Sequence, residues 1–294
     1  TVERKSGFLP PTIKSSNLYG TSIQIPYYKV ISGDKDMTIS PRVFFDNNLL
    51  LQTEYRQAIK NGDAIFDISL NRKNEQTKTH FFGNISKKKQ NKSYEINLQK
   101  VSNDNYLKKY NIQSPLLKGN ETGNLNSYIK FNINEKNYNF DTSIEVYENL
   151  NEESSDRFEF IYPNYNLDKS LFTDKETKGD LKFTSSGFQK HYNTNTYEAL
   201  VINNIIYDSD VYVNNSGLRN SFNILFKNVN SVGENSNAYG NDNNHKLLSA
   251  IMFKLDYPLK KNGEKYNEYL KPIFTARYSP NETKNYKLLN RKLN

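Results

Sequence analysis

Two prolines, Pro11 and Pro26, stand fifteen residues apart in the first forty-one residues, a segment that otherwise resembles a pair of β-strands. Proline has no backbone N–H and cannot donate to the hydrogen-bond ladder of a sheet, so it belongs at sheet edges, strand ends or bulges. Two interpretations are open. Pro11 simply starts one strand and Pro26 ends another, or both prolines weaken strands that must separate. The second interpretation makes this segment the candidate functional site.

Side chains that usually carry catalysis are sparse and scattered. The histidines His80, His191 and His245 have no motif partner, and there is no cysteine. A phospholipase barrel would need a Ser and a His on adjacent strands, and the spacing indicates no such pair. Gly-rich phosphate loops, metal-spaced clusters and nucleophile elbows are also missing. We therefore expect no enzyme activity, no metal site and no cofactor.

Charge and hydropathy narrow the class of protein. The net charge is +8, but the one dense basic run, Lys87–Lys89 followed by Lys92, lies between two strand-like stretches and has the character of a solvated turn. We expect no nucleic-acid partner, because such proteins concentrate their charge in a patch. The longest apolar runs, such as 199–202, are far shorter than the ~18 residues of a transmembrane helix. Strands that cross a membrane are still allowed, because they alternate.

Alternation of apolar and polar residues is the dominant pattern. It predicts an all-β, antiparallel up-and-down meander of roughly 13–14 strands. Asn61-Gly62 and Asn262-Gly263 are tight-hairpin signals, and 106–110 is expected to form a turn of helix in a loop. The clearest alternating runs are 63–70, 94–99, 129–134, 138–146, 222–226 and 251–257.

A membrane barrel and a soluble β-sandwich could both produce this pattern. The polar positions carry Asn, Glu, Lys and Asp, which suit a wet barrel lumen. Aromatic residues gather near strand ends, as the interfacial girdles of a barrel do, although ordinary strand propensity also favours them. These aromatic positions include Tyr27, Tyr28, Phe44, Phe45, Phe81, Phe82 and Tyr162.

The first seventy residues contain an ordered series of short motifs. A basic pair leads into Ser-Gly-Phe-Leu and a proline, then Pro-Tyr-Tyr, then an Asp-containing turn that ends in proline. The matching residues are Arg4, Lys5, Ser6, Gly7, Phe8, Leu9, Pro11, Pro26, Tyr27, Tyr28, Ile31, Asp34, Asp36, Thr38 and Pro41, followed by Glu54, Tyr55, Arg56 and Gly62. In this order the series resembles the start of the barrel in the lipopolysaccharide-assembly outer-membrane family, the LptD or organic-solvent-tolerance family.

The resemblance is weaker later in the chain. The segment 100–102 with Tyr106 resembles a family loop, and 278–280 resembles a mid-barrel element. Residues 120–245 carry no matching motif. Lys29 stands where the family often has Trp, and Gly33 where it usually has Pro.

The resemblance implies a specific organisation. Residues 1–9 would end the connection from a periplasmic jellyroll, and residues 10–294 would form the first half of a large transmembrane barrel of a longer protein. The implied location is the outer membrane of a Gram-negative bacterium. The implied partners are lipopolysaccharide, outer-membrane lipid, the plug lipoprotein LptE and the periplasmic bridge protein LptA.

The implied activity is insertion of lipopolysaccharide into the outer leaflet through a lateral gate, which Pro11 and Pro26 would weaken. The alternatives are a general porin or receptor barrel and a soluble glycan-binding β-sandwich. Half a barrel is an open sheet, so we expect an unclosed meander whose far edge, near 273–278, exposes unpaired backbone groups.

Overall fold

The computed structural model describes residues 4–16, 20–45, 48–73, 76–118, 121–153, 155–172, 178–192, 195–263 and 266–280. Within these ranges it contains twenty strands, the helix α1 (Tyr106–Tyr110) and the 3₁₀ turn η1 (Ser155–Arg157). Eighteen strands form one sheet, and the remaining two form a separate hairpin. Among the described strands, β1 pairs with β4 and β20 pairs with β17, so the sheet is open rather than closed into a barrel. The predicted all-β antiparallel meander is confirmed.

The chain divides into two compact units. Unit 1 comprises Thr1–Asn132, Thr142–Tyr162 and Tyr192–Thr194, and unit 2 comprises Ile133–Asp141, Pro163–His191 and Asn195–Asn294. Four of the described strands have residues in both units: β10 (Asn124–Glu135), β11 (Tyr138–Asn149), β12 (Phe158–Phe172) and β13 (Gly179–Tyr192), the last by Tyr192 alone.

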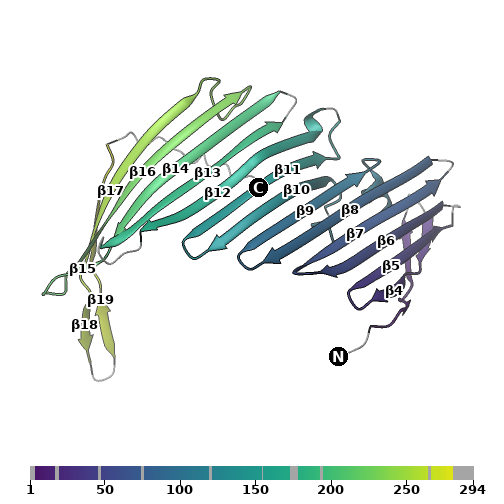
Figure 1. Cartoon of the computed structure of the whole chain (residues 1–294), viewed down its shortest axis with the longest axis horizontal. Helices are drawn as coiled ribbons and strands as arrows, with labels where there is room; N and C mark the ends of the chain where they lie inside the picture. Colours follow the sequence, from purple (N-terminus) through teal and green to yellow (C-terminus); the bar gives the residue numbers. More distant parts are fainter. Residues whose placement is uncertain are drawn as a thin grey trace. The chain divides into compact units, whose positions relative to one another are not determined.

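Unit 1 opens with short strands and continues with long ones (Figure 1). These are β1 (Gly7–Phe8), β2 (Thr12–Ser16), β3 (Gly20–Gln24), β4 (Tyr27–Ser32), β5 (Lys35–Phe44), β6 (Asn48–Ile59), β7 (Gly62–Lys73), β8 (Gln76–Lys89) and β9 (Lys92–Val101). From β4 to β9 each strand pairs with the next in antiparallel register.

Tight turns fix this register. Asn61 has a positive φ of 64°, the conformation that a two-residue hairpin requires. At Gly62 an added Cβ would lie 1.9 Å from the carbonyl oxygen of Ser86 on β8, so only glycine allows the neighbouring strand to approach this closely. The Asn-Gly signal in the sequence therefore identifies a real hairpin.

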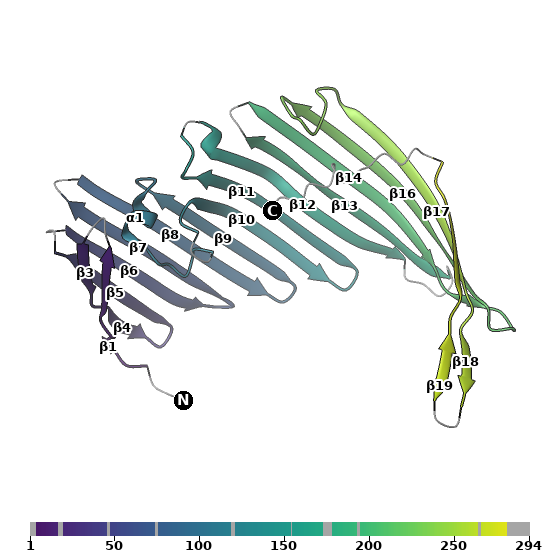
Figure 2. The same cartoon turned by 180° about the vertical axis from the view of Figure 1, so that it is seen from behind.

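The two faces of the unit 1 sheet differ sharply. One face exposes large apolar side chains, and we call it the apolar face; they include Leu51, Ile68, Leu70, Phe81, Ile85, Tyr94, Ile96 and Leu98. The opposite face, the polar face, carries the alternate residues. It is covered by the segment 102–118, and Figure 2 shows α1 of that segment against the sheet at β7 and β8.

The contact between segment 102–118 and the polar face is the core of unit 1. Tyr106, Leu107 and Tyr110 of α1 are buried against side chains of the sheet. The sheet and the following chain contribute Phe44, Leu50, Phe82, Val101, Ile112, Leu117, Leu125 and Leu150. The expected turn of helix at 106–110 is confirmed, and it packs as the centre of a core rather than as a surface turn.

Unit 2 contains β13 (Gly179–Tyr192), β14 (Thr196–Ser209), β15 (Tyr212–Val213), β16 (Arg219–Glu234), β17 (Asn244–Asp256), β18 (Leu259–Asn262), β19 (Asn267–Leu270) and β20 (Ile273–Tyr278). The long strands β14, β16 and β17 pair in sequence order, and β20 follows β17. All six residues of β20 are exposed, as expected for a sheet edge. The separate hairpin is β18 with β19.

One face of the unit 2 sheet is also covered, but less completely than the polar face of unit 1. A small cluster of Leu200, Ile202 and Val229 is capped by Tyr239 from the loop between β16 and β17. The opposite face exposes Ile205, Phe222, Phe226, Ile251 and Phe253, whose register pairs place them in adjacent rows.

Two expectations need correction. The strands outnumber those expected, because the first two predicted strands are each broken into two and because short strands such as β15 were not recognised. The polar positions of β7 were expected to face open water, but Asp67 and Ser69 are fully buried. Segment 102–118 covers them.

Candidate functional site

Three prolines lie in one row across the opening strands of unit 1. Leu9 N donates to the carbonyl oxygen of Pro26 (2.8 Å), and Thr12 pairs with Gln24, so Pro11 lies opposite the Ile25–Pro26 step. On the next strand, Ile25 N donates to the carbonyl oxygen of Pro41 (3.2 Å). We call Pro11, Pro26 and Pro41 the proline row.

The proline row coincides with a break in each of the two opening strands. The chain from Gly7 to Ser16 is split into β1 and β2, and the chain from Gly20 to Ser32 is split into β3 and β4. β5 bridges the second break, because β4 pairs with its first half and β3 with its last three residues. Pro41 lies within β5 itself. The ladder is therefore thinnest along the row.

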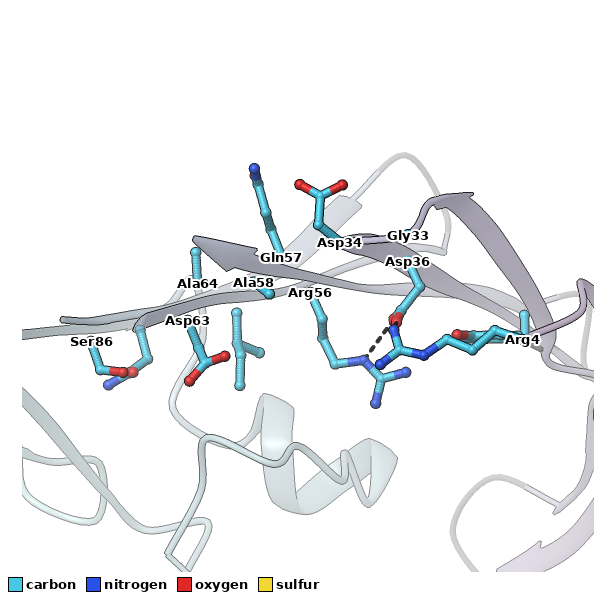
Figure 3. Close-up of a pocket in the computed structure, with 13 residues that line it drawn as sticks. Arg4, Gly33, Asp34, Asp36, Arg56, Gln57, Ala58, Asp63, Ala64 and Ser86 are labelled. Carbon is cyan, nitrogen blue, oxygen red and sulfur yellow. Dashed lines mark hydrogen bonds and ion pairs between the residues drawn. The ribbon is translucent and has the colours of Figure 1, made fainter. Parts of the chain in front are cut away.

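On the side of the proline row nearer the β4–β5 turn, an ion-pair cluster ties the N-terminal segment to the β4–β5 hairpin (Figure 3). Asp36 is bound by Arg4 Nη1 at 3.0 Å and by Arg56 Nε at 2.8 Å. These groups line an open pocket of about 560 Å³. At the turn, the Ser32 hydroxyl donates to Asp34 and lowers the pKa of that carboxyl group. Three carboxylates, of Asp34, Asp36 and Asp63, line the pocket together with the two guanidinium groups of Arg4 and Arg56.

On the other side of the proline row, away from the β4–β5 turn, a chain of hydrogen bonds joins the broken strands to α1. Arg42 on β5 donates from Nε to Ser22 Oγ (3.0 Å) and from Nη1 to the carbonyl oxygen of Tyr110 (2.6 Å). Ser22 on β3 in turn donates to the carbonyl oxygen of Lys14 on β2 (3.3 Å). Through Arg42, segment 102–118 is therefore bonded to the strands that the prolines interrupt.

A second polar network lies beneath α1. Ser69 Oγ is 2.5 Å from His80 Nδ1 and 2.7 Å from the hydroxyl of Tyr106. His80 Nε2 is 3.3 Å from Asp67 Oδ1, and both side chains have no exposed surface. Gln52 Nε2 donates to both oxygens of Asp67 at 3.0 Å. Burial raises the pKa of Tyr106 to about 12, so its hydroxyl stays protonated.

This network shows that the sequence-based statement about histidine was wrong in one respect. Ser69 and His80 are register partners on β7 and β8, so a Ser and a His do lie on adjacent strands. The signal was available: once Lys73 is paired with Gln76, counting outward along the two strands pairs these two residues. The group is buried under α1, and the contact between Ser69 and the Tyr106 hydroxyl ties α1 to the sheet.

The remaining predicted site residues have separate positions. Pro11 is exposed just before β2, and Pro26 is half-buried between β3 and β4. His191 packs on Tyr197 with ring centroids 4.7 Å apart, and His245 Nδ1 is 2.8 Å from Asn230 Oδ1. Within the described ranges, no group of three metal-ligating side chains is present.

Pro41 is the site residue that sequence reasoning missed. It was noted only as the end of a motif, although it follows Pro26 by the same fifteen residues that separate Pro26 from Pro11. The turn at Gly33–Asp34 lies midway between Pro26 and Pro41, so an antiparallel hairpin must bring them close, and the irregularity between Val30 and Ser32 leaves them one residue out of register. The equal spacing of the three prolines about successive turns is the sequence signal that could have identified Pro41.

Comparison with known proteins supplies partial relatives. The chain is 33% identical to the LPS-assembly protein LptD of Pseudoalteromonas translucida over 111 residues, which is 35% of this chain and 15% of that protein. It is 46% identical to LptD of an Azoarcus species over 54 residues, 18% of this chain and 7% of that protein. LptD of Paraburkholderia xenovorans matches at 39% over a segment of the same length. The chain thus matches only a small part of each of these relatives.

Two further comparisons complete these findings. No family model matches the chain. A bacterial polysaccharide outer membrane secretin aligns with 88% of this chain and 91% of its own, at a TM-score of 0.31 and 8% identity. In the part of the chain that the structure describes, no helix has the length and hydropathy needed to cross a membrane.

Proposed function

We propose that the chain is part of an outer-membrane translocon that inserts lipopolysaccharide into the outer leaflet, and that the proline row marks its lateral gate. The partial LptD relatives support the lipopolysaccharide role and, with the all-β sheet, point to the outer membrane of a Gram-negative cell. In this proposal the exposed apolar faces meet lipid, and LptE and LptA are the expected partners. The role is transport, without catalysis.

The single observation that carries the gate is the alignment of the three prolines. Lipopolysaccharide is amphiphilic, so its acyl chains must enter lipid while its sugars cross the hydrocarbon zone, and a closed barrel offers no such exit. In a bilayer no water replaces a missing ladder bond. Of the three donors that the proline row lacks, the two at Pro11 and Pro26 alone lower the free energy of separating the strands by about 2–4 kcal/mol. A porin or receptor barrel has no need of aligned breaks in its first strands.

The test restores the donors in the full-length protein. We expect Pro11→Ala with Pro26→Ala to slow lipopolysaccharide delivery about tenfold or more, since ~1.4 kcal/mol corresponds to a factor of ten. Delivery is measured in vesicles that contain the assembled complex, and heat-modifiable mobility verifies that the barrel still forms. Pro163→Ala, in β12 and outside the row, is the control. Unchanged delivery in the double variant would refute the gate.

A further inference from the structure

Two cationic side chains, those of Lys14 and Arg42, share the polar face of unit 1 next to the proline row, on the side away from the β4–β5 turn. Lys14 on β2 is the register partner of Ser22 on β3, and the hydroxyl of Ser22 receives a hydrogen bond from Arg42 on β5. The side chain of Arg42 is buried, with 7% of the residue exposed.

Neither charge has a carboxylate partner in the part of the chain that the structure describes. Among the described residues, no carboxylate lies within ion-pair distance of Lys14 or Arg42, whereas Arg56 and Arg157 in the same unit each contact two. Arg42 instead uses the neutral oxygens of Ser22 and Tyr110 and lies 5.0 Å from the ring centroid of Phe44. A buried cation without an anion is costly, so such sites normally hold a counter-charge.

We propose that Lys14 and Arg42 form a binding site for a phosphate group carried by a lipid headgroup at the seam, and this rests on the proposed function. A phosphate supplies the missing negative charge, and arginine recognises it with two parallel hydrogen bonds. Lys14 adds a second charge from the neighbouring strand. The site lies where an anionic lipid would enter or leave between the broken strands.

Binding at this site would also affect segment 102–118. A phosphate oxygen that takes the Nη1 hydrogen bond of Arg42 must displace the carbonyl oxygen of Tyr110, which holds the end of α1. The present bond joins a charged donor to a neutral oxygen, whereas a phosphate adds the attraction of a negative charge. That attraction favours the exchange, which would loosen α1 when a phosphate occupies the seam.

The test compares lipopolysaccharide with and without its lipid phosphates, using the full-length protein with its plug lipoprotein. We expect the wild-type complex to bind the phosphorylated form about tenfold more tightly, from one or two charge-assisted bonds. Lys14→Gln with Arg42→Gln should reduce that preference to about threefold or less. Arg42→Lys keeps the charge and should retain part of the preference. Lys29→Gln, an exposed cation on β4, is the matched control.

The outcomes separate the two proposals. Equal wild-type binding of both forms, or a preference that survives in the double variant, overturns the phosphate site and leaves the transport role standing. Failure of the wild-type complex to bind either form overturns both. Vesicles of phosphatidylglycerol and free inorganic phosphate serve as further probes. Binding of either that requires Arg42 supports the phosphate site and identifies which source it accepts.

A spin label at Lys108, which is exposed on α1, gives an independent measurement. Phosphorylated lipopolysaccharide should increase the mobility of the label in the wild-type complex and leave it unchanged with Arg42→Gln. Mobility that rises equally with the dephosphorylated form would contradict the displacement of the Tyr110 carbonyl.

Discussion

Unit 1 and unit 2 both consist of antiparallel sheet, but one face of the sheet is covered to a different extent in each unit. In unit 1 the segment 102–118 folds onto the face and buries Asp67, Ser69 and His80 completely. In unit 2 the loop between β16 and β17 contributes Tyr239 as its one fully packed large side chain among the described residues, and most of the surrounding strand positions stay half-exposed. Both units keep an exposed apolar face on the other side.

The difference indicates where the chain resists opening. Stability within a protein follows the local density of buried contacts, so segment 102–118 should open rarely and the loop of unit 2 often. Segment 102–118 packs mainly on β7 and β8 and reaches β5 through Arg42 and Phe44. We therefore expect any separation at the proposed gate to stay within the opening strands.

The largest expected effect tests this contrast directly. Phe82→Ala removes a fully buried ring beneath α1 and should lower the free energy of unfolding by about 3–5 kcal/mol. Tyr239→Ala in unit 2 should cost about 1–3 kcal/mol, since its cluster is smaller. Denaturant unfolding of the full-length protein in lipid gives both values. Equal losses would mean that the two coverings are equivalent.

The buried polar network offers a sharper test with a smaller effect. Ser69→Ala leaves His80 Nδ1 and the Tyr106 hydroxyl without their shared partner and should destabilise unit 1 by about 1–3 kcal/mol. Amide hydrogen exchange at α1 should rise in the same variant. Thr77→Ala, on the exposed end of β8, should change stability by less than about 0.5 kcal/mol. If exchange at α1 stays at the wild-type rate, the network does not hold the helix.

The smallest effect is a dependence on pH. Burial raises the pKa of Tyr106 to about 12, whereas an unfolded tyrosine ionises near pH ~10. Between these values the folded chain binds more protons than the unfolded chain, so stability is complete below pH ~10 and falls as the pH rises toward 12. Tyr106→Phe should flatten this part of the pH profile, relative to Tyr94→Phe, whose ring is exposed. A profile identical to that of the wild type would show that Tyr106 is not the responsible group.

Alternation and turn residues predicted much of the fold. The runs at 63–70 and 94–99 became β7 and β9, and Asn61 and Gly62 formed the expected turn. These features depend only on local spacing, which the sequence displays directly. The breaks in the first two strands were less visible, because they depend on which prolines lie level across a hairpin.

The candidate site could be predicted only in part. Pro11 and Pro26 were identified, and their role as a gate stays a prediction. The contacts of Arg42 could not be foreseen, since they join β5 to a helix 68 residues further along the chain. The burial of Asp67 and His80 has the same cause. Alternation indicates that two residues share a face, but not that a distant loop will cover it.

The break between β3 and β4 has a mechanical consequence. β3 is held to β5 by three register pairs, whereas β4 keeps five. If the proposed gate opens, we therefore expect the hairpin of β2 and β3 to separate from β5 before β4 does.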